Sequence, residues 1–230
     1  MKTICIIPAK GKSRGIPNKN LIDFCGESLL AWTISQARDS LQMDNIYVSS
    51  DSNEILSLAT VYGIKRIQRP EELALDNTST EEVVLHALDA IKANDEDIIV
   101  LLQATSPLRE NDDIKKAIDL FTNKRFDSLF SISIVKDNTI WKLDTDRRLL
   151  VGALFDNFDR KQMRQDRQDY YYENGSIYVF TAGNIRRYKN RIAGVAGMYM
   201  MPFWKSFEID EEEDIELVEF YFRKKILKER

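Results

Sequence analysis

Apolar runs and helical patterns alternate over about the first 135 residues of the chain. The short apolar runs predict strands over 3–7, 45–48, 64–67, 98–102 and 129–135. Apolar side chains three or four residues apart predict helices over about 28–41, 53–62, 79–91 and 114–121. Such alternation is typical of βαβ units. The pattern therefore predicts an α/β fold with a mostly parallel sheet and helices on both faces.

Local signals support these elements and indicate where chemistry belongs. Ser79 and Glu82 have capping-box spacing, and Gly63 follows the helical pattern before it as a C-cap. Residues 98–102 are all apolar, as expected of a central strand buried on both faces. Ligands of parallel sheets lie beyond the carboxyl ends of the strands. We therefore look for site residues in the loops 8–20, 49–52, 68–80, 103–111 and from 136 onward.

Residues 136–175 interrupt the rhythm with a polar segment that is too long for an ordinary connection. We interpret it as an insertion, either a lid or an oligomerisation arm. Apolar runs over 176–180 and 198–201 predict two more strands, and Asn174-Gly175 is a turn signal before the first of them. A last helix over about 211–229 begins with acidic and ends with basic residues, as the helix dipole favours. We expect a single domain, 1–230, with an inserted arm at about 136–175.

Composition narrows the function classes. The chain has 230 residues, of which 43% are hydrophobic, enough for a sizeable core. Its 33 basic and 37 acidic side chains give a net charge of −4, which argues against a general nucleic-acid binder. No apolar run reaches the roughly 18 residues that a bilayer span requires, and the first run is too short for a signal peptide. Cys5 and Cys25 alone build no disulfide framework, so we predict a cytoplasmic protein without membrane or nucleic-acid partners.

The loop from Pro8 to Asn20 combines two glycines with four cations directly after the first strand. Glycines let backbone amides approach an anion closely, and the cations neutralise it. The loop is not a Walker A motif, because Ile6 stands where its first glycine is required. It is not a dinucleotide fingerprint either, because Ser13 replaces a glycine. A solvated basic loop is the alternative, but the position after the first strand favours phosphate binding.

Two carboxylates, Glu208 and Asp210, stand two residues apart before the last helix. In an extended segment they project to the same face, about 7 Å apart. Mg²⁺ usually takes one or two carboxylates and keeps several waters, so the pair could hold such an ion. The alternative is that Asp210 caps the helix and Glu208 is solvated.

Two further polar stretches are ambiguous. Gln103 to Arg109 follows the most buried strand, where a ligand is expected, but a turn before a helix explains its Thr, Ser and Pro equally well. The tyrosines 170–172 could line a sugar pocket or simply pack. Neither stretch identifies a function by itself.

In combination, these segments resemble the acylneuraminate cytidylyltransferases, the family of the CMP-sialic acid synthetases. The matching stretches are IIPAKGKSRGIPNKNL, RPEELALDNTS, LLQATSPLR, ENGSIYVF and KSFEIDEEED, in the family's order over nearly the whole chain. The resemblance implies a Rossmann-like nucleotidyltransferase fold with a protruding dimerisation element, and so a homodimer. It implies that CTP reacts with a nonulosonic (sialic, legionaminic or pseudaminic) acid to give the CMP-sugar and pyrophosphate, with Mg²⁺ or Mn²⁺ as cofactor.

The resemblance also assigns roles to residues. The triphosphate is expected against the basic positions of the first loop and their neighbours, which are Lys10, Gly11, Ser13, Arg14 and Lys19. Asn20 falls on a nucleotide-contacting asparagine and Arg69 on an arginine near the cytosine. The acidic sugar is associated with Gln103, Lys142, Arg164 and Tyr178. Glu208 and Asp210 fall on the metal-binding pair, and the expected catalytic residues are Lys10, Lys19 and Asp210.

Three departures from the family pattern keep alternatives open. Lys10 stands where arginine is common, and lysine cannot make a bidentate contact with phosphate. Glu208 replaces the first acid of an Asp-x-Asp pair, and Tyr172 and Glu173 replace an arginine and a proline next to the sugar. The last change argues against N-acetylneuraminate itself. The alternatives are a CMP-Kdo-type synthetase for an eight-carbon sugar acid and a catalytically inactive nucleotide-binding module.

Overall fold

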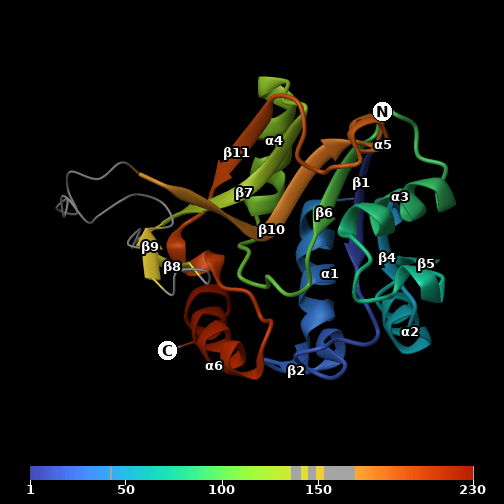
Figure 1. Cartoon of the computed structure of the whole chain (residues 1–230). Helices are drawn as coiled ribbons and strands as arrows, with labels where there is room; N and C mark the ends of the chain where they lie inside the picture. Colours follow the sequence, from blue (N-terminus) through green and yellow to red (C-terminus); the bar gives the residue numbers. More distant parts are fainter. Residues whose placement is uncertain (42, 136–140, 145–148, 153–168, 230) are drawn as a thin grey trace.

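A seven-stranded sheet forms the centre of the protein. The computed structural model describes residues 1–41, 43–135, 141–144, 149–152 and 169–229. The strand order is β11-β7-β10-β6-β1-β4-β5 (Figure 1). The bounds are β1 Thr3–Pro8, β4 Ile46–Ser50, β5 Lys65–Gln68, β6 Ile98–Leu102, β7 Ser128–Ile134, β10 Tyr171–Thr181 and β11 Ala196–Met200. Only β10 runs antiparallel to its neighbours in this sheet, so the predicted mostly parallel α/β fold is confirmed.

Helices cover both faces of the sheet. One face packs against α1 (Leu29–Ser40), α2 (Asn53–Val61) and α4 (Asp113–Lys124), through a buried cluster that includes Ile34, Ile55 and Ile114. The other face packs against α3 (Thr80–Ala90) and α5 (Ala182–Tyr188). Each fully buried aliphatic side chain stabilises the fold by roughly 1.5–3 kcal/mol. These two layers hold the strand ends, and thus the loops beyond them, in fixed positions.

Helix starts follow the sequence signals. Ser79 and Glu82 form the predicted capping box at α3, and Gly63 has the positive φ of a residue just past the end of α2. Ser28 caps α1 by accepting a hydrogen bond from the Ala31 N–H, and Ser52 does the same for the Ile55 N–H of α2. Within the described residues, no helix is long and apolar enough to cross a bilayer.

The C-terminal helix closes a third apolar cluster. Helix α6 (Glu212–Tyr221) continues into a π-helical turn, Phe222–Ile226, close to the predicted end of the helix. Val218 and Phe222 are fully buried, together with Phe24 beside the two-stranded ribbon of β2 (Asp23–Phe24) and β3 (Glu27–Ser28). Ile209, between the two candidate metal ligands, is buried in the same cluster. The cluster therefore fixes the segment that carries Glu208 and Asp210.

The prediction of a turn at Asn174-Gly175 is wrong. Strand β10 begins at Tyr171, and the two residues lie within it, where the pairing with β7 shifts between Glu173 and Tyr178. The Asn174 amide is buried and hydrogen-bonds to Ser131 and Ser133 of β7 instead of forming a turn. Gly175 supplies the positive φ that the irregularity requires. The strand thus starts inside the segment that we expected to be the arm.

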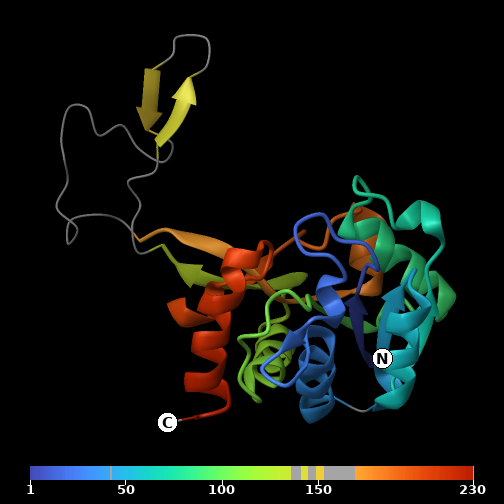
Figure 2. The same cartoon turned by 90° about the horizontal axis from the view of Figure 1, so that it is seen from below.

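The predicted arm contains a two-stranded antiparallel ribbon of its own. Strands β8 (Trp141–Asp144) and β9 (Leu149–Gly152) pair with each other and lie outside the main sheet (Figure 2). Residues 136–140, 145–148 and 153–168 of the arm lie outside the described residues. Arg164 is among them.

Candidate active site

The loops after β1, β5 and β6 and the start of α3 meet at the carboxyl edge of the sheet and enclose a cavity of about 220 Å³. Six of the predicted site residues line it, namely Lys10, Ser13, Lys19, Asn20, Arg69 and Gln103. Ser79, Thr80 and Thr105 contribute hydroxyl-bearing side chains to the same wall. The fold therefore brings five of the predicted nucleotide residues and one predicted sugar residue, Gln103, around one space.

The cations of the first loop are held by a carboxylate from another loop. The Asp76 carboxylate accepts a hydrogen bond from the Lys10 ammonium and another from Arg14 Nε, at 2.6 Å. These contacts hold the pKa of Asp76 below its usual range. The Asn20 side-chain amide donates to the Lys10 carbonyl oxygen over 2.8 Å, which fixes the loop backbone. Lys10 and Arg14 are thus gathered around one anionic group, as they would be around a phosphate.

The two carboxylates near the carboxyl end of the chain lie beside this loop. Lys19 Nζ is 2.9 Å from Asp210 Oδ1, although 191 residues separate the two in sequence. A Cβ on Gly15 would come within 2.3 Å of the Asp210 carbonyl oxygen, so the loop packs directly on this segment. The Ile209 N–H donates to the Thr105 carbonyl oxygen over 2.8 Å. The basic loop, the loop after β6 and the carboxylate pair therefore converge.

Asp210 is free of the capping role that was its alternative. Glu211 occupies the N-cap of α6, and the Asp214 carboxylate accepts from the N–H groups of Asp210 and Glu211, each over 2.8 Å. The Asp210 side chain is 70% exposed and pairs with Lys19 instead. Its carboxylate is therefore exposed beside the basic loop and available to a ligand there.

Glu208 points at the backbone of β10. A Cβ on Gly175 would come within 2.1 Å of Glu208 Oε1, so the missing side chain of Gly175 makes room for this carboxylate. Burial and the neighbouring Asp210 charge raise the pKa of Glu208 to about 7, and Lys19 opposes the shift. A carboxylate in this situation is stabilised by a divalent cation, which supplies the missing positive charge.

Gly175→Ala is expected to displace Glu208 and to lower catalytic activity by about tenfold or more, the usual cost of disturbing a metal ligand's support. The substitution also strains a residue at φ +66°. Gly26→Ala is the matched control, because Gly26 has φ +90° with nothing within 4 Å of its Cβ. Measuring the activity and melting temperature of both variants separates the effect of the Glu208 contact from that of backbone strain. Equal losses in both variants would contradict the role of Gly175 in making room for Glu208.

The stability of the metal-free protein is expected to fall as the pH rises from about 4.5 to 7. In that range an unfolded Glu208 loses its proton while the folded one keeps it, because its pKa is raised to about 7. The penalty is about 3 kcal/mol above pH 7. Urea denaturation in EDTA at several pH values measures it, and Glu208→Gln should remove this part of the slope. Parallel pH curves for both proteins would contradict the assignment.

Arg69 offers buried donors to the cavity. Its side chain is 4% exposed and pairs with Asp51 at the end of β4, Nη2 to Oδ1, over 3.3 Å. Its buried Nε has no hydrogen-bond partner among the described residues. Asp51 also accepts from the Gly11 N–H over 3.0 Å, so one acid orients both the arginine and the basic loop. Gly11 itself lines a neighbouring cavity of about 480 Å³ with Asn18 and Asp51.

One predicted sugar residue that the structure describes, Tyr178, does not line the cavity. Tyr178 is 2% exposed, its hydroxyl donates to Glu173, and Arg191 covers its ring at 4.6 Å from the centroid. Lys142 lies on β8, whose side chains are outside the described set, as is Arg164. Of the two predicted sugar residues whose side chains the structure describes, Gln103 lines the cavity and Tyr178 does not.

Asp51, Asp76 and Gly175 were missed by the sequence analysis. Asp51 and Asp76 lie in loops 49–52 and 68–80, which the strand-end rule had marked, but a single acid in a loop carries no sign of its partner. Gly175 was taken for a turn residue. The strand-end rule was thus the one signal that could have found two of the three.

Comparison with known proteins identifies the family. A family model described as cytidylyltransferase matches residues 4–228. The chain belongs to the cytidylyltransferase family. The family match spans the loop at 8–20 and the carboxylate pair, so it includes every residue of the cavity.

Two relatives of this chain are named for different sugar acids. The chain is 32% identical over 220 residues to the N-acylneuraminate cytidylyltransferase of Streptococcus agalactiae, over 93% of this chain and 52% of that one. It is 29% identical to the pseudaminic acid cytidylyltransferase of Campylobacter jejuni, over 97% of both chains. The chain therefore spans about half the length of the N-acylneuraminate relatives and nearly all of the pseudaminic one.

Solved structures share the fold at low sequence identity. A CMP:2-keto-3-deoxy-manno-octonic acid synthetase complexed with CTP superposes with a TM-score of 0.72 and 14% identity, over 97% of this chain and 99% of that one. A 4-diphosphocytidyl-2C-methyl-D-erythritol synthase of Anaerococcus prevotii gives 0.66 and 16%, over 96% of each. These similarities establish the nucleotidyltransferase-type α/β fold.

Proposed function

We propose that the protein transfers CMP from CTP to a nonulosonic acid, giving the CMP-sugar and pyrophosphate. The observation that carries the proposal is that the basic loop, whose Lys10 and Lys19 line the cavity, packs against the segment of Glu208 and Asp210, with Lys19 paired to Asp210. Enzymes that transfer groups from a nucleoside triphosphate neutralise its phosphates with basic side chains and with a divalent metal ion held by carboxylates. The relatives named for N-acylneuraminate and pseudaminic acid supply the sugar class.

The nucleotide is proposed to lie with its phosphates at the basic loop. Lys10, Arg14 and Lys19 would neutralise the triphosphate, assisted by backbone N–H groups near Gly11 and Ser13. Arg69 would donate to the cytosine ring, whose oxygen and ring nitrogen accept hydrogen bonds, while Asn20 contacts the nucleotide. The unpartnered Nε of Arg69 supports this role, since a buried donor without an acceptor is costly unless a ligand completes it.

Glu208 and Asp210 fit a Mg²⁺ site shared with the substrate. Within the described residues no group of three His, Cys, Asp or Glu side chains could hold a metal, so the pair would need phosphate oxygens and waters as further ligands. Mg²⁺ is usually bound in this way, through one or two carboxylates plus phosphates. When bound, Mg²⁺ (or Mn²⁺) would stabilise the charge that develops on the phosphates and lower the pKa of the attacking hydroxyl.

The chain's own residues would carry out the rest of the reaction. Lys10 and Lys19 would hold the α-phosphate and the leaving pyrophosphate while charge shifts onto them. Gln103 would orient the acidic sugar at the wall of the cavity that the loop after β6 forms. Lys142, Arg164 and Tyr178 stay candidates for the sugar on the strength of the family resemblance. Asp210 would keep Lys19 in place until the phosphates arrive.

Pyrophosphate release tests the proposal. Purified protein is mixed with CTP, Mg²⁺ and a panel of sugar acids that contains N-acetylneuraminic, legionaminic and pseudaminic acids and Kdo. Turnover with a nine-carbon acid is the expected result. Turnover with Kdo alone would favour the eight-carbon alternative, which the relatives' names support less well. CTP binding without turnover on any sugar would favour the inactive nucleotide-binding module.

The homodimer and the cytoplasmic location also belong to this proposal. Exposed apolar side chains gather on β11 and the start of β10, namely Val195, Met198, Met200 and Tyr171. The register sets Met198 beside Phe130 and Tyr171 beside Ile134, so they share one face of the sheet end. Such a patch is a surface that a second copy could cover. Both cysteines are free, as expected of the cytoplasm.

Light scattering tests the homodimer. The wild-type protein is expected to have twice the chain mass at micromolar concentration, and the double variant Met198→Glu, Met200→Glu is expected to dissociate, because the new charges would be buried without partners. Leu217→Glu on α6, which replaces another exposed apolar side chain, serves as the control and should stay dimeric. A wild-type protein with the mass of one chain would contradict the proposal.

A further inference from the structure

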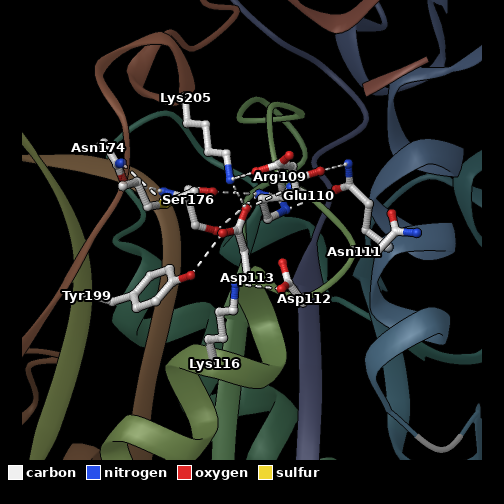
Figure 3. Close-up of polar contacts among 12 residues, drawn as sticks. Arg109, Glu110, Asn111, Asp112, Asp113, Lys116, Asn174, Ser176, Tyr199 and Lys205 are labelled. Carbon is white, nitrogen blue, oxygen red and sulfur yellow. Dashed lines mark hydrogen bonds and ion pairs between the residues drawn. The ribbon is translucent and has the colours of Figure 1, made fainter. Parts of the chain in front are cut away.

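A buried lysine lies just before the candidate metal ligands and outside the cavity. Lys205 is in the 3-10 turn Phe203–Ser206, three residues before Glu208, and only 2% of its side chain is exposed. Its Nζ is 2.7 Å from Asp113 Oδ2 and 2.6 Å from Glu110 Oε2 (Figure 3). Burying an ammonium group costs free energy unless the charge is paired. The two carboxylates around Lys205 therefore indicate that this lysine has a structural role.

The partners of Lys205 stand at the start of α4. Asp113 is 3% exposed, and both of its oxygens are occupied. Oδ1 accepts from the Tyr199 hydroxyl over 2.9 Å, and Oδ2 accepts from the Glu110 N–H over 2.7 Å in addition to Lys205. The pair therefore has a single geometry, and it joins the 203–210 segment to the loop that runs from β6 to α4 (Figure 3).

The same loop is tied to the candidate site at its other end. Arg109, which is fully buried, donates to the Gln103 carbonyl oxygen and to Ser176, the residue after Gly175. The Thr105 carbonyl oxygen accepts from the Ile209 N–H. The loop thus contacts the segment on both sides of Glu208, through Lys205 before it and Ile209 after it.

Stability alone does not account for this arrangement. A buried ion pair is often no more stable than well-packed apolar residues of similar volume, because both charges lose their hydration. A hydrogen-bonded ion pair does fix the relative positions of the two segments that carry it. Side chains that hold metal ligands in the right orientation are needed for full metal affinity.

We propose that Lys205, through its ion pair with Asp113, is a positioning residue that holds the Glu208–Asp210 segment in the geometry needed to bind a divalent cation with CTP. The inference rests on the proposed function, and it concerns the metal rather than the nucleotide. Lys205 is proposed to contact neither the metal nor the nucleotide. Its loss should therefore lower the affinity for the metal and leave the contacts of the nucleotide intact.

The test measures two affinities separately. Mn²⁺ binding to the protein–CTP complex is followed by electron paramagnetic resonance, and CTP binding in EDTA by calorimetry. Lys205→Met is expected to lower the Mn²⁺ affinity about 10–100-fold and to leave the CTP affinity unchanged. This is the usual cost of losing a residue that orients a metal ligand. Lys116→Met is the matched control, because Lys116 makes an exposed pair with Asp112 on the same helix. It should change neither affinity.

Each outcome decides the inference. Unchanged Mn²⁺ affinity in Lys205→Met, or a parallel loss of Mn²⁺ and CTP affinity, overturns it, as does a wild-type complex that binds no Mn²⁺. If Lys205→Met does not fold, Tyr199→Phe replaces it. That variant removes one hydrogen bond to Asp113 and should lower the Mn²⁺ affinity about fivefold. An unchanged Mn²⁺ affinity would overturn the inference. A wild-type protein that binds CTP and Mn²⁺ without turnover refutes the proposed function but not this inference.

Discussion

Replacing Asp210 with asparagine is expected to lower the rate of pyrophosphate release about a thousandfold at saturating CTP, since a metal contributes several kcal/mol of charge stabilisation in the transition state. Asparagine keeps the shape of the side chain and removes its charge. Asp210 is 70% exposed and makes no capping contact, so the melting temperature should stay the same. Initial rates over a range of Mg²⁺ concentrations, together with thermal melts, measure both effects.

Glu212→Gln is the matched control for this experiment. Glu212 is an exposed acid two residues further on, at the start of α6, and removing its charge changes the net charge of the protein by the same amount. Its activity should be that of the wild type. A small and equal loss in both variants would show that Asp210 acts only through the general field of the acidic segment.

Arg109→Met is expected to destabilise the protein by about 3–5 kcal/mol, the range seen when a buried, fully bonded charged group is removed. Arg109 is 0% exposed and donates to oxygens of Thr33, Gln36, Gln103 and Ser176. Burial lowers its pKa to about 10, so the guanidinium remains charged at neutral pH. Without it, four buried acceptors at the meeting point of α1, β6 and β10 lose their donor.

Urea denaturation at pH 7 measures this loss, with Arg38→Met as control. Arg38 is an exposed arginine on α1, two residues from Gln36, and its substitution should cost less than about 0.5 kcal/mol. A similar small cost for Arg109→Met would mean that the four acceptors find other donors, such as water. Arg109→Lys should recover only part of the stability, because lysine cannot span the same oxygens.

The sheet was predictable because its central strands are apolar throughout. Ile98–Leu102 pairs with neighbours on both sides and is fully buried, and its continuous run of apolar residues identified it. The start of β10 was not predictable in the same way. Asn174-Gly175 favours a turn locally, and only the serines of β7, more than 40 residues earlier, give the buried amide its partners. Tertiary contacts overrode the local preference there.

The site was predictable by residue type and not by pairing. The cationic loop and the two acids each suggested an anion or a metal, but their meeting depends on a contact between Lys19 and Asp210 across 191 residues. The family resemblance supplied that connection. Neither the residue pattern nor the family resemblance pointed to Lys205. Nothing in the sequence around it indicates that this lysine is buried against Asp113, 92 residues earlier.

The shared hold of Asp76 on Lys10 and Arg14 has a consequence for nucleotide exchange. If the triphosphate binds at this loop as proposed, it must displace the Asp76 carboxylate from both cations. Part of the electrostatic attraction would then be offset by the loss of these two ion pairs, and the nucleotide would bind less tightly than the local charge suggests. When the CMP-sugar leaves, Asp76 would pair with the cations again, which would favour release of a product that still carries a phosphate.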